Sequence, residues 1–142
     1  MTTSEGRIRL CLRVLLALLY LAVGYMHITG PEGFVAITPD WVPAPEMVVW
    51  LTGLAEIAGA VGLMIPCSFI SWARPAAGIG LALYALCVWP ANINHALYDI
   101  PLNGKHASWW YHGPRLAFQP VFIWLALWVG GVLPLRRFFA RS

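Results

Sequence analysis

Apolar residues occur in four long stretches, separated by short connections that are rich in proline and glycine. The stretches cover residues 10–28, 47–65, 76–97 and 116–133. Each is close to the length of about 20 residues that an α-helix needs to cross a membrane. Proline and glycine are typical of turns and helix ends. The pattern therefore predicts an all-α fold: an integral membrane four-helix bundle that forms a single domain over residues 1–142.

The composition agrees with a membrane location and argues against several other classes of protein. Of the 142 residues, 60% are hydrophobic and 11% are charged, whereas soluble domains have about 25% charged residues. A soluble globule of this length could not cover its surface with so few charges. A soluble enzyme, a disordered linker and a nucleic-acid-binding protein are therefore poor interpretations, although the isoelectric point is about 9.0.

The cysteines do not indicate a metal or thiol-redox centre. Cys11, Cys67 and Cys87 are odd in number and form no C-x-x-C pair. This pattern argues against a disulfide scaffold, a structural zinc site and a thiol relay. The chain also lacks a Cys-x-x-Cys-His motif, a P-loop and a dinucleotide fingerprint. We therefore predict no structural metal site built on cysteines, no covalent haem and no nucleotide cofactor, and we assign no residue as a metal ligand.

The first apolar stretch could be either a signal peptide or a retained membrane span. Arginines precede it, and residues 14–23 would serve as the apolar region of a signal peptide. No convincing cleavage site follows, and residues 24–27 continue the helix. A retained span is the favoured interpretation.

The basic residues predict how the bundle is oriented. Two of the nine, Lys105 and Arg115, fall on one side of the predicted membrane. The seven on the other side are Arg7, Arg9, Arg13, Arg74, Arg136, Arg137 and Arg141. An excess of Lys and Arg marks the cytoplasmic side, so we expect both termini in the cytoplasm. The expected location is the cell membrane, as a multi-pass protein surrounded by the lipid bilayer. In a Gram-negative bacterium this would be the inner membrane.

The two connections on the outer side are longer than simple turns. Residues 29–46 contain an apolar segment followed by three prolines, which predicts a short interfacial segment under a rigid turn. Residues 98–114 are expected to be a flexible loop that could cover the bundle. His106 and His112 lie in this loop, and we expect both to be solvated.

An acidic residue lies in the middle of the second apolar stretch. Glu56 follows Met47 by nine residues, which at about 1.5 Å per residue places it near the middle of a core about 30 Å thick. A charge at this depth costs about 2.5–3.5 kcal/mol on insertion scales, so it should face the bundle interior and have a partner. His27 and Arg115 are the leading candidates. A structural hydrogen bond, proton handling and ligand binding all remain open as roles.

Polar residues of the other stretches are expected between the membrane midplane and the outer surface. Asn92 and His95 are three residues apart and share a helix face, whereas Asn94 points elsewhere. Arg115 and Gln119 are four residues apart and also share a face. The structural alternatives are helix capping for His27, a kink at Pro90 and Asn92, and an interface anchor for Arg115.

All six polar residues would then form one site. We predict Glu56 and His27 as its catalytic residues. Ligand-binding roles are predicted for four further residues, Asn92, His95, Arg115 and Gln119.

Several segments resemble the DoxX family of small membrane proteins. They include GYMH at 24–27, PEGF at 31–34, GLAEIAG at 53–59, PAN at 90–92 and RLAFQ at 115–119. The resemblance covers nearly the whole chain. Its departures are Asn94-His95 and the long aromatic loop of residues 104–113. It implies a four-helix membrane protein associated with a terminal quinol oxidase or a thiosulfate:quinone oxidoreductase.

Three functions remain open, and the sequence leaves open whether the protein is an enzyme. The first is a quinone-associated or redox-accessory subunit of a membrane oxidoreductase. In it Glu56 and His27 would exchange protons, and Asn92 or Gln119 would donate hydrogen bonds to the quinone. The second is a structural or assembly subunit without its own activity. The third is a haem or metal site that uses His27 and His95. Under any of these functions, the helix faces with small residues would also suit a homodimer.

The predicted orientation can be tested by cysteine labelling in intact cells. In a background without native cysteines, a membrane-impermeant thiol reagent should fail to label cysteines placed at Ser4 or Ser142. The same reagent should label a cysteine at Asn103, which lies in an outer loop. Labelling of Ser4 or Ser142 variants from outside would contradict the orientation.

Overall fold

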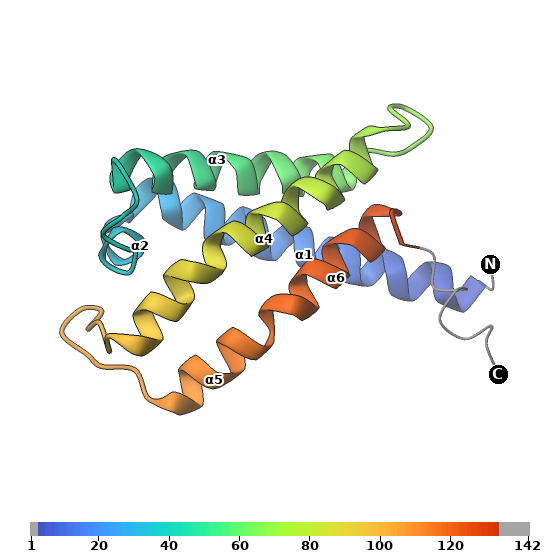
Figure 1. Ribbon diagram of the computed structural model, residues 1–142. Helices are drawn as coiled ribbons and strands as arrows, with labels where there is room; N and C mark the ends of the chain where they lie inside the picture. Colours follow the sequence, from blue (N-terminus) through green and yellow to red (C-terminus); the bar gives the residue numbers. More distant parts are fainter. Residues whose placement is uncertain (1–2, 134–142) are drawn as a thin grey trace.

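The computed structural model describes residues 3–133 of the chain, with side chains from residue 6 onward. This part consists of helices and connections, with an isolated bridge between Leu102 and Lys105, so the predicted all-α fold is confirmed. The helices are α1 (Thr3–Thr29), α2 (Glu32–Ala36), α3 (Pro45–Met64), α4 (Ala73–Leu97), α5 (Trp109–Ala117) and α6 (Gln119–Gly130) (Figure 1). Arg136, Arg137 and Arg141 lie outside the described residues.

Three helices within residues 3–133 are long and apolar enough to cross a membrane. They comprise Gly6–Thr29, Pro45–Met64 and Ala73–Leu97, and they correspond to the first three predicted spans. Their outer faces carry large apolar side chains that are exposed, such as Leu15, Leu51 and Leu83. Apolar exposure of this extent is unusual for a soluble monomer and agrees with a membrane protein.

The fourth predicted span is not one continuous helix. The sequence predicted a helix over 116–133, but α5 and α6 are separated at Phe118, and α6 ends at Gly130. Pro120 lies in the first turn of α6, where its missing N–H is tolerated, and it disfavours a helix that continues through it. Figure 1 shows α5 and α6 nearly end to end. A fourth crossing of a membrane would therefore need both helices.

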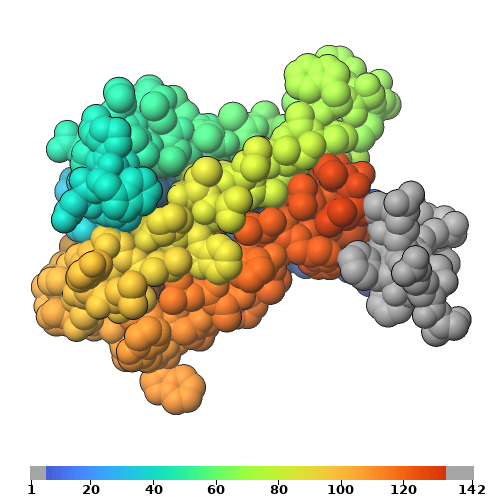
Figure 2. Space-filling view, in the orientation of Figure 1, coloured from blue at the N-terminus to red at the C-terminus, as the bar shows by residue number. Residues whose placement is uncertain are grey.

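The helices pack in a simple order along the chain. Helix α1 packs on α3, α3 on α4, and α4 on α6. Figure 2 shows α4 running diagonally across the visible face, with α3 on one side and α5 and α6 on the other. The core forms where these helices meet, and its buried residues include Leu16, Tyr20, Leu63, Leu81 and Val129.

Glycines set the close approach of the helices. A Cβ atom on Gly53 of α3 would lie 2.9 Å from the carbonyl oxygen of Gly24 in α1. A Cβ atom on Gly78 of α4 would lie 2.8 Å from the carbonyl oxygen of Ala126 and 2.9 Å from Cα of Gly130. Small residues allow helix backbones to approach in this way. These glycines therefore form packing contacts between helices of the same chain.

The connections contain more structure than the sequence indicated. The expected short segment in residues 29–46 is present as α2, and Asn94 ties this connection to α4 by donating to the carbonyl oxygen of Ile37 over 3.1 Å. The expected loop 98–114 instead becomes helical from Trp109. His112 is only 3% exposed, so the expectation that it is solvated was wrong. Gly113 and Pro114 lie within α5.

The glycine contacts predict opposite effects for two neighbouring substitutions in α4. Gly78→Ala should lower the free energy of unfolding by about 1–3 kcal/mol, because the added methyl group would overlap the backbone of α6. Gly80→Ala is the matched control, because nothing lies within 4 Å of its Cβ position. It should raise stability by up to about 1 kcal/mol through helix propensity. Unfolding in detergent measures both, and equal effects would contradict the packing.

Candidate functional site

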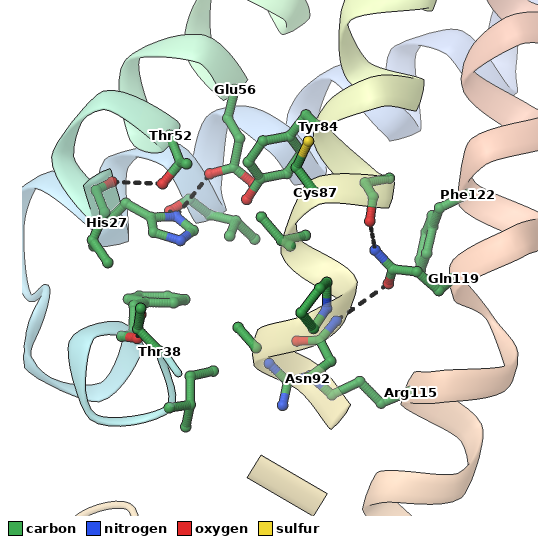
Figure 3. A pocket seen from close by; sticks show the side chains of 18 of the residues that line it. His27, Thr38, Thr52, Glu56, Tyr84, Cys87, Asn92, Arg115, Gln119 and Phe122 are labelled. Carbon is green, nitrogen blue, oxygen red and sulfur yellow. Dashed lines mark hydrogen bonds and ion pairs between the residues drawn. The ribbon is translucent and has the colours of Figure 1, made fainter. Parts of the chain in front are cut away.

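A cavity of about 730 Å³ opens between α1, α3, α4 and the α5–α6 pair. Its walls are mainly apolar, and residues of the α2 connection, including Phe34 and Trp41, cover part of it. The volume lies within the range of about 300–1,000 Å³ that is typical of small-molecule sites. Figure 3 shows polar side chains on two opposite walls of this cavity. The cavity is therefore the candidate functional site.

The first polar wall is a buried pair between α1 and α3. Nδ1 of His27 lies 2.7 Å from Oε2 of Glu56, and the two residues are only 6% and 1% exposed. The structure thus brings Glu56 to His27, one of the two expected partners. Gly53 makes this contact geometrically feasible, because a Cβ atom there would lie 2.7 Å from Cβ of His27.

The surroundings of His27 determine which ring nitrogen faces the cavity. Nδ1 also lies 3.0 Å from the carbonyl oxygen of Val23. A carbonyl oxygen can only accept a hydrogen bond, so Nδ1 carries the proton. The ring of Phe34 stacks on the imidazole with a centroid distance of 3.8 Å and fixes its plane. Nε2 is then left for the cavity (Figure 3), where it can accept a proton from a ligand or return one.

Tyr84 of α4 extends this wall, and the sequence analysis did not single it out. Figure 3 shows its side chain beside the carboxyl group of Glu56. Its ring also packs edge-on against that of Tyr20, with a centroid distance of 5.9 Å. A buried tyrosine hydroxyl usually finds a hydrogen-bond partner. A tyrosine in the middle of an apolar span was therefore a signal that could have identified it.

The second polar wall is an amide pair between α4 and α6. Nδ2 of Asn92 donates to Oε1 of Gln119 over 3.3 Å, and Nε2 of Gln119 donates to the carbonyl oxygen of Ala85 (Figure 3). Both ends of the Gln119 amide are thus engaged in holding α6 against α4. Asn92 retains an N–H and its carbonyl oxygen, and it lines the cavity. It is the better placed of the two to contact a ligand.

Arg115 and His95 form a separate contact between α5 and α4. Nη1 of Arg115 lies 2.9 Å from Nδ1 of His95. Because a guanidinium can only donate, Nδ1 of His95 accepts and the imidazole is neutral. His95 is 1% exposed and does not line the cavity, whereas Arg115 does. The ring of His95 instead faces His112, with a centroid distance of 4.6 Å.

The structure therefore gathers five of the six predicted site residues around one cavity and places His95 behind its wall. The five are His27, Glu56, Asn92, Arg115 and Gln119. The two histidines of the haem hypothesis do not share a cavity. Within the described residues, no group of three His, Cys, Asp or Glu side chains is arranged to hold a metal ion.

The comparison with protein families identifies the chain. The model of a family described as a domain of unknown function, DUF8561, matches residues 16–130. This match covers most of the chain, so the protein belongs to the DUF8561 family. No curated protein and no solved structure matches the chain.

The family match corrects the resemblance to DoxX proteins. Residues 16–130 include every segment on which that resemblance rested, and they match DUF8561 and not DoxX. The assignment to DoxX was therefore wrong. Glycines at helix crossings are common in membrane bundles of many families, and prolines are tolerated in their helices, so their order is a weak marker of ancestry.

The burial of the His27–Glu56 pair predicts a large loss of stability when one partner is removed. His27→Leu should cost about 3–5 kcal/mol, because it leaves Glu56 buried without its partner. The double variant His27→Leu with Glu56→Leu should recover part of this loss, because no buried polar group is left behind. Unfolding in detergent measures both variants.

An exposed pair provides the control for this experiment. His106 and Asp99 also form a histidine–carboxylate pair, at 2.9 Å, but their side chains are 63% and 60% exposed. His106→Leu should therefore cost at most about 1 kcal/mol. A loss for His27→Leu no greater than that for His106→Leu would contradict the importance of the buried pair.

Proposed function

We propose that this member of the DUF8561 family is a membrane protein whose cavity binds the head group of a quinone. The observation that carries the proposal is the His27–Glu56 pair, which lies in the wall of a cavity that is otherwise mainly apolar. A quinone combines an apolar ring and tail with two carbonyl oxygens. It therefore needs an apolar slot, a hydrogen-bond donor and a group that exchanges protons.

The two polar walls supply complementary parts of such a site. Nε2 of His27 accepts the proton of a hydroxyl group when the head group is in its quinol form, and Glu56 stabilises the imidazolium that forms. The imidazolium can return this proton to an oxygen of the quinone as the quinone is reduced. The free N–H of Asn92 donates to the head group from the opposite wall. Gln119 positions Asn92. Arg115, on the cavity wall, adds a cationic donor.

The proposal includes an arrangement in the membrane. Helices α1, α3 and α4 cross the bilayer, and α5 with α6 completes a fourth crossing, so that both termini lie in the cytoplasm. This makes the protein a multi-pass protein of the cell membrane with its cavity in the outer half. Apolar side chains on the outer faces of the helices and the excess of arginine near the N-terminus support this arrangement.

The chemistry of a quinone also requires a source of electrons. In the proposal a membrane oxidoreductase partner exchanges electrons with the quinone, and this chain holds the head group and handles a proton. The protein is then an accessory subunit of that partner. This role follows from the proton-exchanging pair and not from the family, which carries no assigned function.

The proposal can be tested by titrating the purified protein with decylubiquinone in detergent. Trp41 and Trp110 line the cavity, so quenching of tryptophan fluorescence should report binding. Glu56→Gln removes the acid while keeping the volume, and it should weaken binding about tenfold or more. Gln119→Leu should weaken binding as well, because Asn92 loses its positioning contact. Both variants should remain folded.

Glu46→Gln is the matched control for this titration. Glu46 is an exposed acid in the first turn of the same helix and does not line the cavity, so its loss should leave binding unchanged. If Glu56→Gln and Gln119→Leu lower thermal stability and binding falls only with the folded fraction, the polar residues are structural. The assembly function would then replace the quinone function.

A further inference from the structure

A second cavity lies at the opposite end of the bundle and is lined by three arginines. It measures about 410 Å³ and forms where the first turns of α1, the start of α4 and the end of α6 meet. Arg9 and Arg13 come from α1, and Arg74 comes from α4. Its remaining lining residues are Gly6, Leu10, Cys67, Pro75, Val129, Gly130 and Gly131. None of the lining residues is acidic.

The positive charges of this cavity have no carboxylate partner in the part of the chain whose side chains are described. The ion pairs found there join His27 to Glu56 and His106 to Asp99. Arg9 donates instead to the carbonyl oxygen of Trp128, and Arg74 donates to that of Ile65 over 3.0 Å. These contacts hold two guanidinium groups in place without neutralising them.

Burial adds to the cost of leaving these charges without a counterion. Nε of Arg13 and Nε of Arg74 are both buried and have no hydrogen-bond partner among the described residues. The charges of Arg9 and Arg74 also act on Arg13 as like charges. Like charges in a partly dehydrated site repel more strongly than in water. An anion in the cavity would offset this repulsion.

The geometry of the donors favours one class of anion. Guanidinium groups present forked donors that match the oxygens of phosphate. Helix α4 begins at Ala73, beside the cavity, and its first turn contains no acidic residue. The partial positive charge of a helix N-terminus also favours an anion.

We propose that this arginine cavity, defined by Arg9, Arg13 and Arg74, binds a phosphate group. The group is either the head group of an anionic phospholipid or a soluble phosphate. The cavity lies at the ends of helices long enough to cross a membrane, where lipid head groups are found. Basic pockets between membrane helices bind anionic head groups by the same chemistry. The site is independent of the cavity that contains His27 and Glu56.

The arginines could instead serve only to orient the chain in the membrane. Arg7 allows the two explanations to be separated, because it lies in the same helix and is exposed, outside the cavity. An orienting charge acts from any exposed position near the helix end. A phosphate site requires the arginines that line the cavity.

The test compares the full chain in nanodiscs of phosphatidylcholine with and without phosphatidylglycerol. Phosphatidylglycerol should raise the thermal unfolding temperature of the wild type and of Arg7→Gln. The increase should be absent in the double variant Arg13→Gln with Arg74→Gln. Affinity for phosphatidylglycerol, measured by native mass spectrometry, should fall about fivefold for each neutralised arginine.

A second arm of the experiment identifies the source of the phosphate. Inorganic phosphate is added to the protein in phosphatidylcholine nanodiscs at constant ionic strength. Stabilisation by inorganic phosphate assigns the site to a soluble ligand, and stabilisation by phosphatidylglycerol alone assigns it to a lipid. Either result supports the arginine cavity, provided that the double variant loses the effect.

Three results would overturn the proposal. The first is that neither probe stabilises the wild type, and the second is that the folded double variant keeps the effect. The third is that Arg7→Gln loses the effect as fully as the double variant. If the double variant fails to fold, Arg13→Lys takes its place. Lysine keeps the charge but loses the forked donors, so Arg13→Lys should bind phosphatidylglycerol more weakly than the wild type. Unchanged binding by a folded Arg13→Lys, together with unchanged binding by Arg9→Gln, would exclude the site.

Discussion

The close contact between α1 and α3 governs the arrangement of the rest of the molecule. Gly24 and Gly53 allow the two backbones to approach so closely that a Cβ atom on either would lie within 2.9 Å of the other's carbonyl oxygen. One turn further along each helix, the same approach brings His27 and Glu56 to 2.7 Å. The buried acid thus finds a partner because two residues without side chains lie beside it. The close packing of α1 on α3 therefore also determines which polar groups meet in the site.

The two ends of the bundle have different chemical characters. At one end, α4 and α6 diverge from α1 and α3 enough to leave a large cavity with mainly apolar walls. At the other end, Gly78 and Gly130 bring α4 and α6 together, and arginines gather where the helix ends meet. An apolar slot with a buried histidine–carboxylate pair suits a neutral, lipid-like molecule. A cluster of guanidinium groups suits an anion.

The sequence by itself determined that the protein is all-helical and has helices apolar enough to cross a membrane. Long apolar stretches can be satisfied only by helices in lipid, because every backbone polar group must be hydrogen-bonded within its own segment. This reasoning identified α1, α3 and α4 and the burial of Glu56. It also singled out five residues that share a cavity, because polar side chains in apolar helices must avoid lipid. Family membership could not be obtained in this way, because the motifs reflect packing requirements that unrelated bundles share.

Only the tertiary structure decided which polar residues meet. His27 and Arg115 were equal candidates for Glu56, and the crossing of α1 over α3 selected His27, while Arg115 contacts His95. The burial of His112 and the position of Tyr84 depend on contacts between helices that are distant in the sequence. The arginine cavity also depends on contacts between helices that are distant in the sequence. Arg13 and Arg74 are separated by two helices in the chain, and each alone is an ordinary basic residue at a helix end. Their convergence depends on how the helices cross, and hydrophobic periodicity along a single chain carries no information about that geometry.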